Sequence, residues 1–102
     1  MCHLEEHEII RSTSDFLDVI SNCPTDTVVL NKDRLHEDFF ELRTRLAGEC
    51  LQKITNYRMR LVILGSFDNI ESRSLRDFIY ESNKNGKTVF AEEINSAIDL
   101  LR

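Results

Sequence analysis

The stretch Met59-Arg-Leu-Val-Ile-Leu-Gly65 decides the fold class of this chain. Successive side chains of a strand point to opposite faces, so the four apolar residues 61–64 make both faces of this segment apolar. Strands that are buried on both faces are typical of the interior of parallel sheets. We therefore predict a central parallel strand over residues 59–64 that ends at Gly65.

The chain on either side of this strand alternates between strand and helix patterns. Apolar and β-branched runs predict three further strands, over residues 8–11, 27–30 and 88–91. Parallel strands need crossover connections, which are usually helices. We therefore predict an α/β fold of four βα units with a mainly parallel four-stranded sheet. It forms a single domain over residues 1–102, with a frayed terminus over residues 1–7.

Capping residues mark where the helices begin and end. Ser12 has the side chain and the position of an N-cap for the first helix. Ser72 or Ser74 caps the third helix, which ends near Asn83 with Gly86 just past its end. These signals place the first and third helices independently of the strand pattern.

A long second helix is predicted over residues 38–57, because its apolar residues form one broad face that extends to Tyr57 at about 100° per residue. Cys50 lies on this face, which predicts a buried core thiol rather than a nucleophile. Arg43 lies on the same face, so it needs an acidic partner, a route to the rim or an anionic ligand. Gly48 lies on the opposite side of this helix. A glycine there either allows close approach of a partner chain or is the result of neutral drift.

Length and charge narrow the functional classes. The chain has 102 residues and a net charge of −5, and its longest wholly apolar run is far too short to cross a bilayer. An acidic chain is a poor binder of nucleic acid. Residues 42–76 nevertheless carry a net charge of +4, which suits an anionic ligand or an acidic partner, or is neutralised within the fold. Acidic residues near the start differ from a secretory signal, so we expect a cytoplasmic protein.

The cysteines and histidines give little sign of a redox or metal centre. Cys2, Cys23 and Cys50 form an odd set without a repeated spacing, which predicts free thiols. Cys2, His3 and His7 include soft metal ligands, but they lie in an acidic terminus, so we expect no metal and no other cofactor. Neither a nucleophile with its base nor a Gly-rich phosphate motif stands out.

The carboxyl ends of the predicted strands meet at one edge of the sheet, where open α/β sheets bind ligands. The turn over residues 65–69 leads from the central strand to a helix, and its backbone N–H groups either hold an anion or belong to a plain βα loop. The candidate binding residues at or near this edge are Asn31, Lys32, Arg43, Gly65, Ser66, Asp68 and Arg76. Asp68 and Glu92 are also candidates for an acid pair in a small enzyme.

Three segments of the chain resemble a known bacterial family. They are DFFELRTRLAGECLQKITNY at residues 38–57, RLVILG at residues 60–65 and SLRDFIYESN at residues 74–83. The resemblance is to the family called domain of unknown function 4180, and it covers about residues 8–101. That family usually has Gly where this chain has Arg45 and an acidic residue where it has Ser66.

The order of elements also resembles, more distantly, the STAS domain, the fold of anti-sigma-factor antagonists, whose core is four turns of a βα superhelix. Such antagonists switch partners through a phosphorylated Ser or Thr, and residues 31–38 contain neither. The resemblance therefore implies the fold and a binding role, without the phosphoswitch. We expect a non-enzymatic interaction or regulatory module that binds a protein partner or a small anion at the carboxyl edge, with a small enzyme as the alternative.

The second apolar face of the central strand must also be covered. Four sequential crossovers with every helix on one side leave that face open to water. Either a helix that crosses to the second face or a second copy of the chain covers it. The sequence leaves the helix and the homodimer as equal alternatives.

Overall fold

Three parallel strands form the centre of the molecule: β2 (Thr27–Asn31), β3 (Arg60–Leu64) and β4 (Thr88–Ala91). The structure, a computed structural model, describes residues 2–3, 10, 12–23, 25–35, 37–41, 45–67 and 70–101. Strand β3 pairs in parallel with β2 on one side and with β4 on the other, so that Val62 lies between Val29 and Val89. The prediction of a central parallel strand that is apolar on both faces is confirmed.

The edge of the sheet beside β2 differs from the prediction. The two-residue strand β1 (Cys2–His3) pairs in parallel with β2 there. Of the strand predicted over residues 8–11, only Ile10 is described, and it forms an isolated parallel bridge with Leu35. Because Leu35 lies beyond the end of β2, Ile10 pairs with the segment that follows the strand rather than with the strand itself.

Four α-helices accompany the strands: α1 (Thr13–Ser21), α2 (Leu46–Asn56), α3 (Arg73–Asn85) and α4 (Ile94–Leu100). Their ends confirm the predicted caps. The Ser12 hydroxyl accepts a hydrogen bond from the Asp15 N–H, and the Ser72 hydroxyl accepts one from the Leu75 N–H. Gly86, with φ 82°, ends α3 in the left-handed conformation that glycine favours. None of the helices in the described ranges is long and apolar enough to cross a membrane.

The predicted long second helix is wrong in its first part. A short 3-10 helix, η2 (Glu37–Phe40), comes first, and α2 begins only at Leu46. Arg45 has φ 62°, and a left-handed residue cannot continue a right-handed helix. Glycine would adopt this conformation at a lower cost than arginine does.

The face of α2 is mostly as predicted. Cys50 and Ile54 are buried, whereas Gly48 is exposed on the opposite side with open space around it. Tyr57 is the exception, because it lies just past the end of the helix and is 52% exposed.

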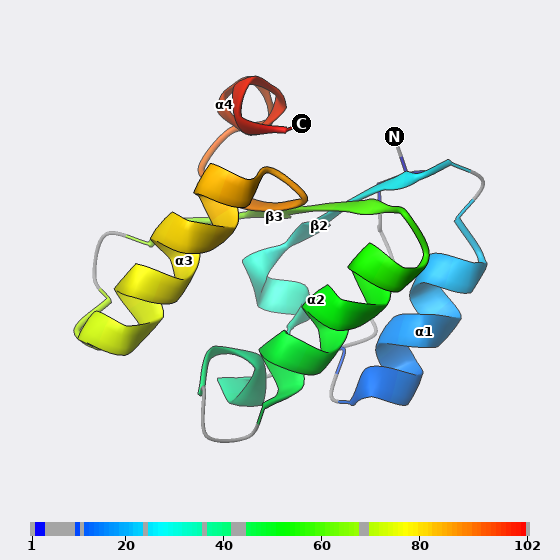
Figure 1. Ribbon diagram of the computed structural model, residues 1–102, viewed down its shortest axis with the longest axis horizontal. Helices are drawn as coiled ribbons and strands as arrows, with labels where there is room; N and C mark the ends of the chain where they lie inside the picture. Colours follow the sequence, from blue (N-terminus) through cyan, green and yellow to red (C-terminus); the bar gives the residue numbers. More distant parts are fainter. Residues whose placement is uncertain are drawn as a thin grey trace.

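The helices cover the two faces of the sheet unequally (Figure 1). Helices α1, α2 and α3 pack on one face, where the core holds Phe16, Cys50, Leu61 and Phe90 among others. Of the described helices, α4 alone lies on the opposite face. Its Ala97 is completely buried in a second cluster with Val29, Val62, Val89 and Ala91. Thus a helix from the same chain covers the second face, which was one of the two alternatives.

The cysteines also differ from the prediction. Cys23 is disulfide-bonded, so the expectation of free thiols is wrong for this residue. Cys50 is free and buried, as predicted. Because Cys23 is disulfide-bonded, the cysteines no longer support the expectation of a reducing compartment.

Candidate partner-binding edge

The carboxyl ends of β2, β3 and β4 lie at one edge of the sheet. The register aligns Asn31 with Leu64, and Leu64 with Ala91. The pairing continues one residue further, since the Gly65 N–H donates a hydrogen bond of 2.9 Å to the Ala91 carbonyl. Parallel pairing therefore brings together the two loops that the sequence singled out, at residues 31–32 and 65–66.

Lys32 and Gly65 make the closest contact at this edge. Lys32 opens the 3-10 helix η1 (Lys32–Arg34), which follows β2 directly. A Cβ atom on residue 65 would lie only 2.7 Å from the Lys32 Cβ, so the lysine stem occupies the space that a side chain at 65 would need. The Lys32 ammonium donates a hydrogen bond of 2.8 Å to the Ser66 carbonyl. Glycine at 65 thus allows Lys32 to cross from one loop to the other.

One aromatic ring contacts this lysine, and two more pack against that ring. The Lys32 Nζ atom lies 5.3 Å from the centroid of the Phe67 ring, within the range of a cation–π contact. The Phe67 ring contacts the rings of Phe40 and Phe90, with centroids 6.3 and 5.4 Å apart respectively. Phe40 and Phe67 are half-buried, whereas Phe90 belongs to the core. The edge therefore carries an ordered cluster of Lys32, Phe40 and Phe67, which we call the edge cluster.

The remaining candidate residues are only partly placed. Arg76 lies in the first turns of α3 and is exposed. Within the described ranges it has no hydrogen bond or ion pair to the edge cluster. Arg43 and Asp68 lie outside the described residues. The structure thus groups Asn31, Lys32, Gly65 and Ser66 and leaves Arg76 on a separate helical surface.

Sequence reasoning missed the two rings of the edge cluster. Phe67 lies in the turn after the central strand, between Ser66 and a polar segment. An apolar ring in a turn that is otherwise polar is a signal that could have identified it. Phe40 gave no such signal, because the expected long helix made it one apolar residue among many.

Cys50 does not provide a nucleophile. Burial, together with a smaller effect of the nearby Glu49 carboxylate, raises the pKa of its thiol to about 12. The thiolate, which is the reactive form, is therefore scarce at neutral pH. Cys50 is a small core residue, as its position on the apolar face of α2 predicts.

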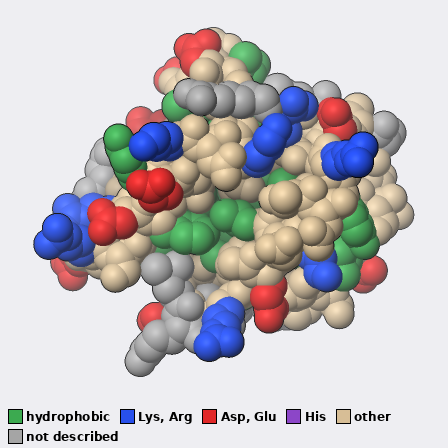
Figure 2. Space-filling view, viewed as in Figure 1, with side chains coloured by type: hydrophobic (Ala, Val, Ile, Leu, Met, Phe, Trp, Pro, Cys, Tyr) green, Lys and Arg blue, Asp and Glu red, His purple; other side chains and the backbone are tan. Residues whose placement is uncertain are grey.

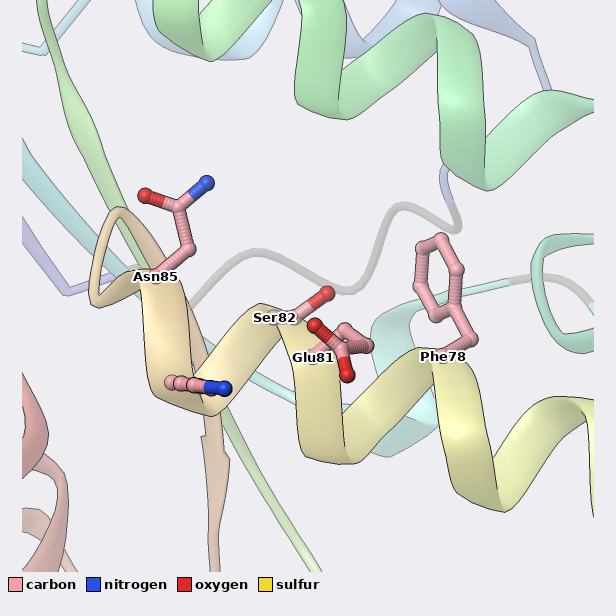
Figure 3. A pocket seen from close by; sticks show the side chains of 5 residues that line it. Phe78, Glu81, Ser82 and Asn85 are labelled. Atoms are coloured by element: carbon pink, nitrogen blue, oxygen red, sulfur yellow. The ribbon is translucent and has the colours of Figure 1, made fainter.

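A shallow groove runs between α2 and α3. One cavity of about 410 Å³ is lined by Phe78, Glu81, Ser82, Lys84 and Asn85, and Figure 3 shows Phe78 and Asn85 on the side of α3 that faces α2. A smaller cavity of about 170 Å³ also includes Gly48 and Gln52 of α2. Hydrophobic side chains are visible between the two helices in Figure 2. The described lining residues include no cysteine or histidine, and none of them forms a nucleophile with a base.

The structure also bears on the expectation of no metal site. Within the described ranges, no group of three or more His, Cys, Asp or Glu side chains is arranged to hold a metal ion. The side chains of Cys2 and His3, and all of His7, lie outside those ranges.

These features define a small α/β domain with a parallel sheet whose carboxyl edge carries an ordered lysine and two half-buried rings. The model of one protein family, described as Domain of unknown function (DUF4180), matches residues 1–101. The chain therefore belongs to this family, which confirms the resemblance found in the sequence. No curated protein and no solved structure matches the chain.

Proposed function

We propose that this chain is a non-enzymatic interaction module that binds a protein partner at the carboxyl edge of its sheet. The observation that carries the proposal is the edge cluster, in which Lys32 is held between the Ser66 carbonyl and the Phe67 ring. Phe40 and Phe67 are half-buried, so they present apolar surface while their ring contacts hold them in place. Rigid aromatic side chains of this kind are enriched at the energetic centres of protein interfaces.

The Lys32 ammonium adds a charge to this apolar surface. Its bond to Ser66 uses one of its three N–H donors, so the others can pair with a partner carboxylate or with a small anion. A small anion is therefore the second ligand class at the same atoms. The protein partner is favoured because an anion alone gives no role to the rings.

The other expectations from the sequence stay predictions. A small enzyme would need an acid pair of Asp68 and Glu92, and its only support is the position of these residues after β3 and β4. A distant STAS-like relationship is supported by the alternating order of strands and helices. A homodimer is supported only through the partner-binding edge, because α4 already buries the second face. The cytoplasmic location also stays a prediction.

Site-specific photo-crosslinking in the native host tests the proposed function. A photoreactive residue at the exposed position 66 is expected to capture a protein, whereas the same residue at Ile98 on α4 serves as the matched control. With the captured protein purified, Phe67→Ala and Lys32→Glu should each weaken its affinity by about tenfold. Capture at both positions alike, or unchanged affinity of both variants, would refute the proposal. Binding of phosphate or acetate alone that Lys32→Glu abolishes would favour the small anion.

A further inference from the structure

A stripe of basic and aromatic residues runs along the exposed side of α3, and its last member, Lys84, also lines the cavity described above. Its members, which we call the α3 stripe, are Arg73, Arg76, Tyr80 and Lys84. Spacings of three and four residues place all four within an arc of about 80° on the helix surface. All four are exposed, and Tyr80 is the most exposed large hydrophobic residue described, at 66%. The stripe covers roughly 16 Å along the helix.

The charges in and around this stripe are of both signs. Within the described ranges, Arg73, Arg76 and Lys84 take part in no ion pair. Asp77 and Glu81 also lie on α3, along one flank of the stripe: Asp77 follows Arg73 by four residues, and Glu81 lines the same cavity as Lys84. Figure 2 shows blue and red side chains next to each other over this helix. The stripe thus presents three positive charges and one ring, with two carboxylates along one flank.

We propose that the α3 stripe docks an acidic helical segment of a protein partner. Charge complementarity selects the occupant, because three cations at helical spacing match carboxylates at the same spacing on a second helix. Tyr80 supplies the apolar contact in the middle of the row, and Arg and Tyr are the residue types that most often dominate interface energies. The stripe has no apolar anchor beyond this ring, which disfavours a membrane surface.

This inference rests on the proposed function, since it describes the chemistry of the same partner. Helix α3 follows the loop that leaves β3 at the carboxyl edge, so Arg73 and Arg76 form the end of the stripe nearest that edge. A partner that contacts Phe67 would thus reach the stripe by extending along α3. Arg76, which the sequence identified as a candidate binding residue, would then contact the partner from α3 and not from the edge cluster.

The test uses a fluorescent helix-forming peptide with Glu at positions i, i+3, i+7 and i+11 and Leu between them, measured by anisotropy against the full chain. Wild type is expected to bind this peptide, to bind poorly to the same peptide with Lys in place of Glu, and to lose affinity as salt rises. Arg73→Glu combined with Arg76→Glu should weaken binding about tenfold, and Tyr80→Ala about fivefold. These residues are exposed, so the variants should fold, as circular dichroism can verify.

Lys53→Glu is the matched control, because it changes the same type of charge on α2 and should leave peptide affinity unchanged. Equal binding of the Glu and Lys peptides, or equal losses from Lys53→Glu and Arg76→Glu, would overturn the α3 proposal. So would tighter binding to vesicles of anionic lipid than to the peptide, or self-association of wild type that Arg76→Glu abolishes. Crosslinking from position 66 is measured separately, so failure of the stripe and failure of the edge are distinguishable.

Discussion

Two glycines in this chain have opposite environments. A Cβ atom at Gly65 would lie 2.7 Å from the Lys32 Cβ, an atom close to the backbone that cannot swing away. A Cβ atom at Gly48, in α2, would meet nothing within 4 Å. The same substitution, Gly→Ala, should therefore change the stability in opposite directions at the two positions.

Gly65→Ala is expected to lower the free energy of unfolding by about 1–3 kcal/mol, because it forces Lys32 or the β3 end to move. Gly48→Ala is expected to raise it by about 0.5–1 kcal/mol, since alanine favours the helix and fits the open space. Urea unfolding of both variants measures the difference. If Lys32→Gly restores the stability lost in Gly65→Ala, the loss arises from the contact between residues 32 and 65. Equal stabilities of the two alanine variants would contradict the prediction.

At the scale of elements, the outer edge of β4 is closed by a side chain from α3. Lys87 and Ala91 face β3, so Phe90 presents its backbone groups on the opposite side, where no strand follows within the described chain. The Asn83 side chain accepts a hydrogen bond of 2.7 Å from the Phe90 N–H and donates one of 3.2 Å to its carbonyl. The amide thereby replaces a neighbouring strand at one residue.

Asn83→Ala should remove both bonds and destabilise the fold by about 1–3 kcal/mol, since it leaves the Phe90 backbone groups unpaired. It should also favour pairing between copies through the open strand, because unpaired edges promote such contacts. Chemical unfolding and light scattering over a concentration series measure the two effects. Asn85→Ala, two residues later at an exposed position, is the control and should change stability by less than about 0.5 kcal/mol.

Elements that depend on local patterns were predictable from the sequence. Strands β2, β3 and β4 follow apolar runs, and α1 and α3 begin after serines that act as caps. The start of α2 was not predictable, because the left-handed Arg45 has no local signal: arginine is an ordinary helix former. The interruption therefore arises from tertiary context, and the continuous apolar pattern over residues 38–57 concealed it.

The candidate site was likewise predictable only in part. Parallel strands imply that residues 31–32 and 65–66 meet at one edge, and they do. The direction of the Lys32 side chain and its contact with Phe67 depend on the 3-10 helix after β2, which no periodicity indicates. Sequence reasoning thus located the edge but could not identify the edge cluster.

At the scale of the whole molecule, one short helix protects an entire face of the sheet. Helix α4 has seven residues, and its Ala97 is fully buried against the sheet while the adjacent Ile98 is 48% exposed. The valines at positions 62 and 89 beneath it are completely buried. The burial of this face in a single chain therefore depends on the docking of α4.

Ala97→Asp is expected to undock α4 and to destabilise the fold by roughly 3 kcal/mol or more, because it places an unpaired carboxylate in an apolar cluster. The exposed valines should then bind a hydrophobic dye. Ile98→Asp, which makes the same change one residue later on the outer side, should have little effect on either readout. Similar behaviour of the two variants would mean that α4 does not protect this face.

The strands follow one another across the sheet in the same order as along the chain. During synthesis on the ribosome, each new βα unit can therefore add to a partner that has already emerged, and no strand has to be inserted between two others. Helix α4 comes after every strand, so the valine-rich side stays open until nearly all of this sequence has been translated. Nascent chains should consequently be most vulnerable to chaperone capture just before α4 leaves the exit tunnel.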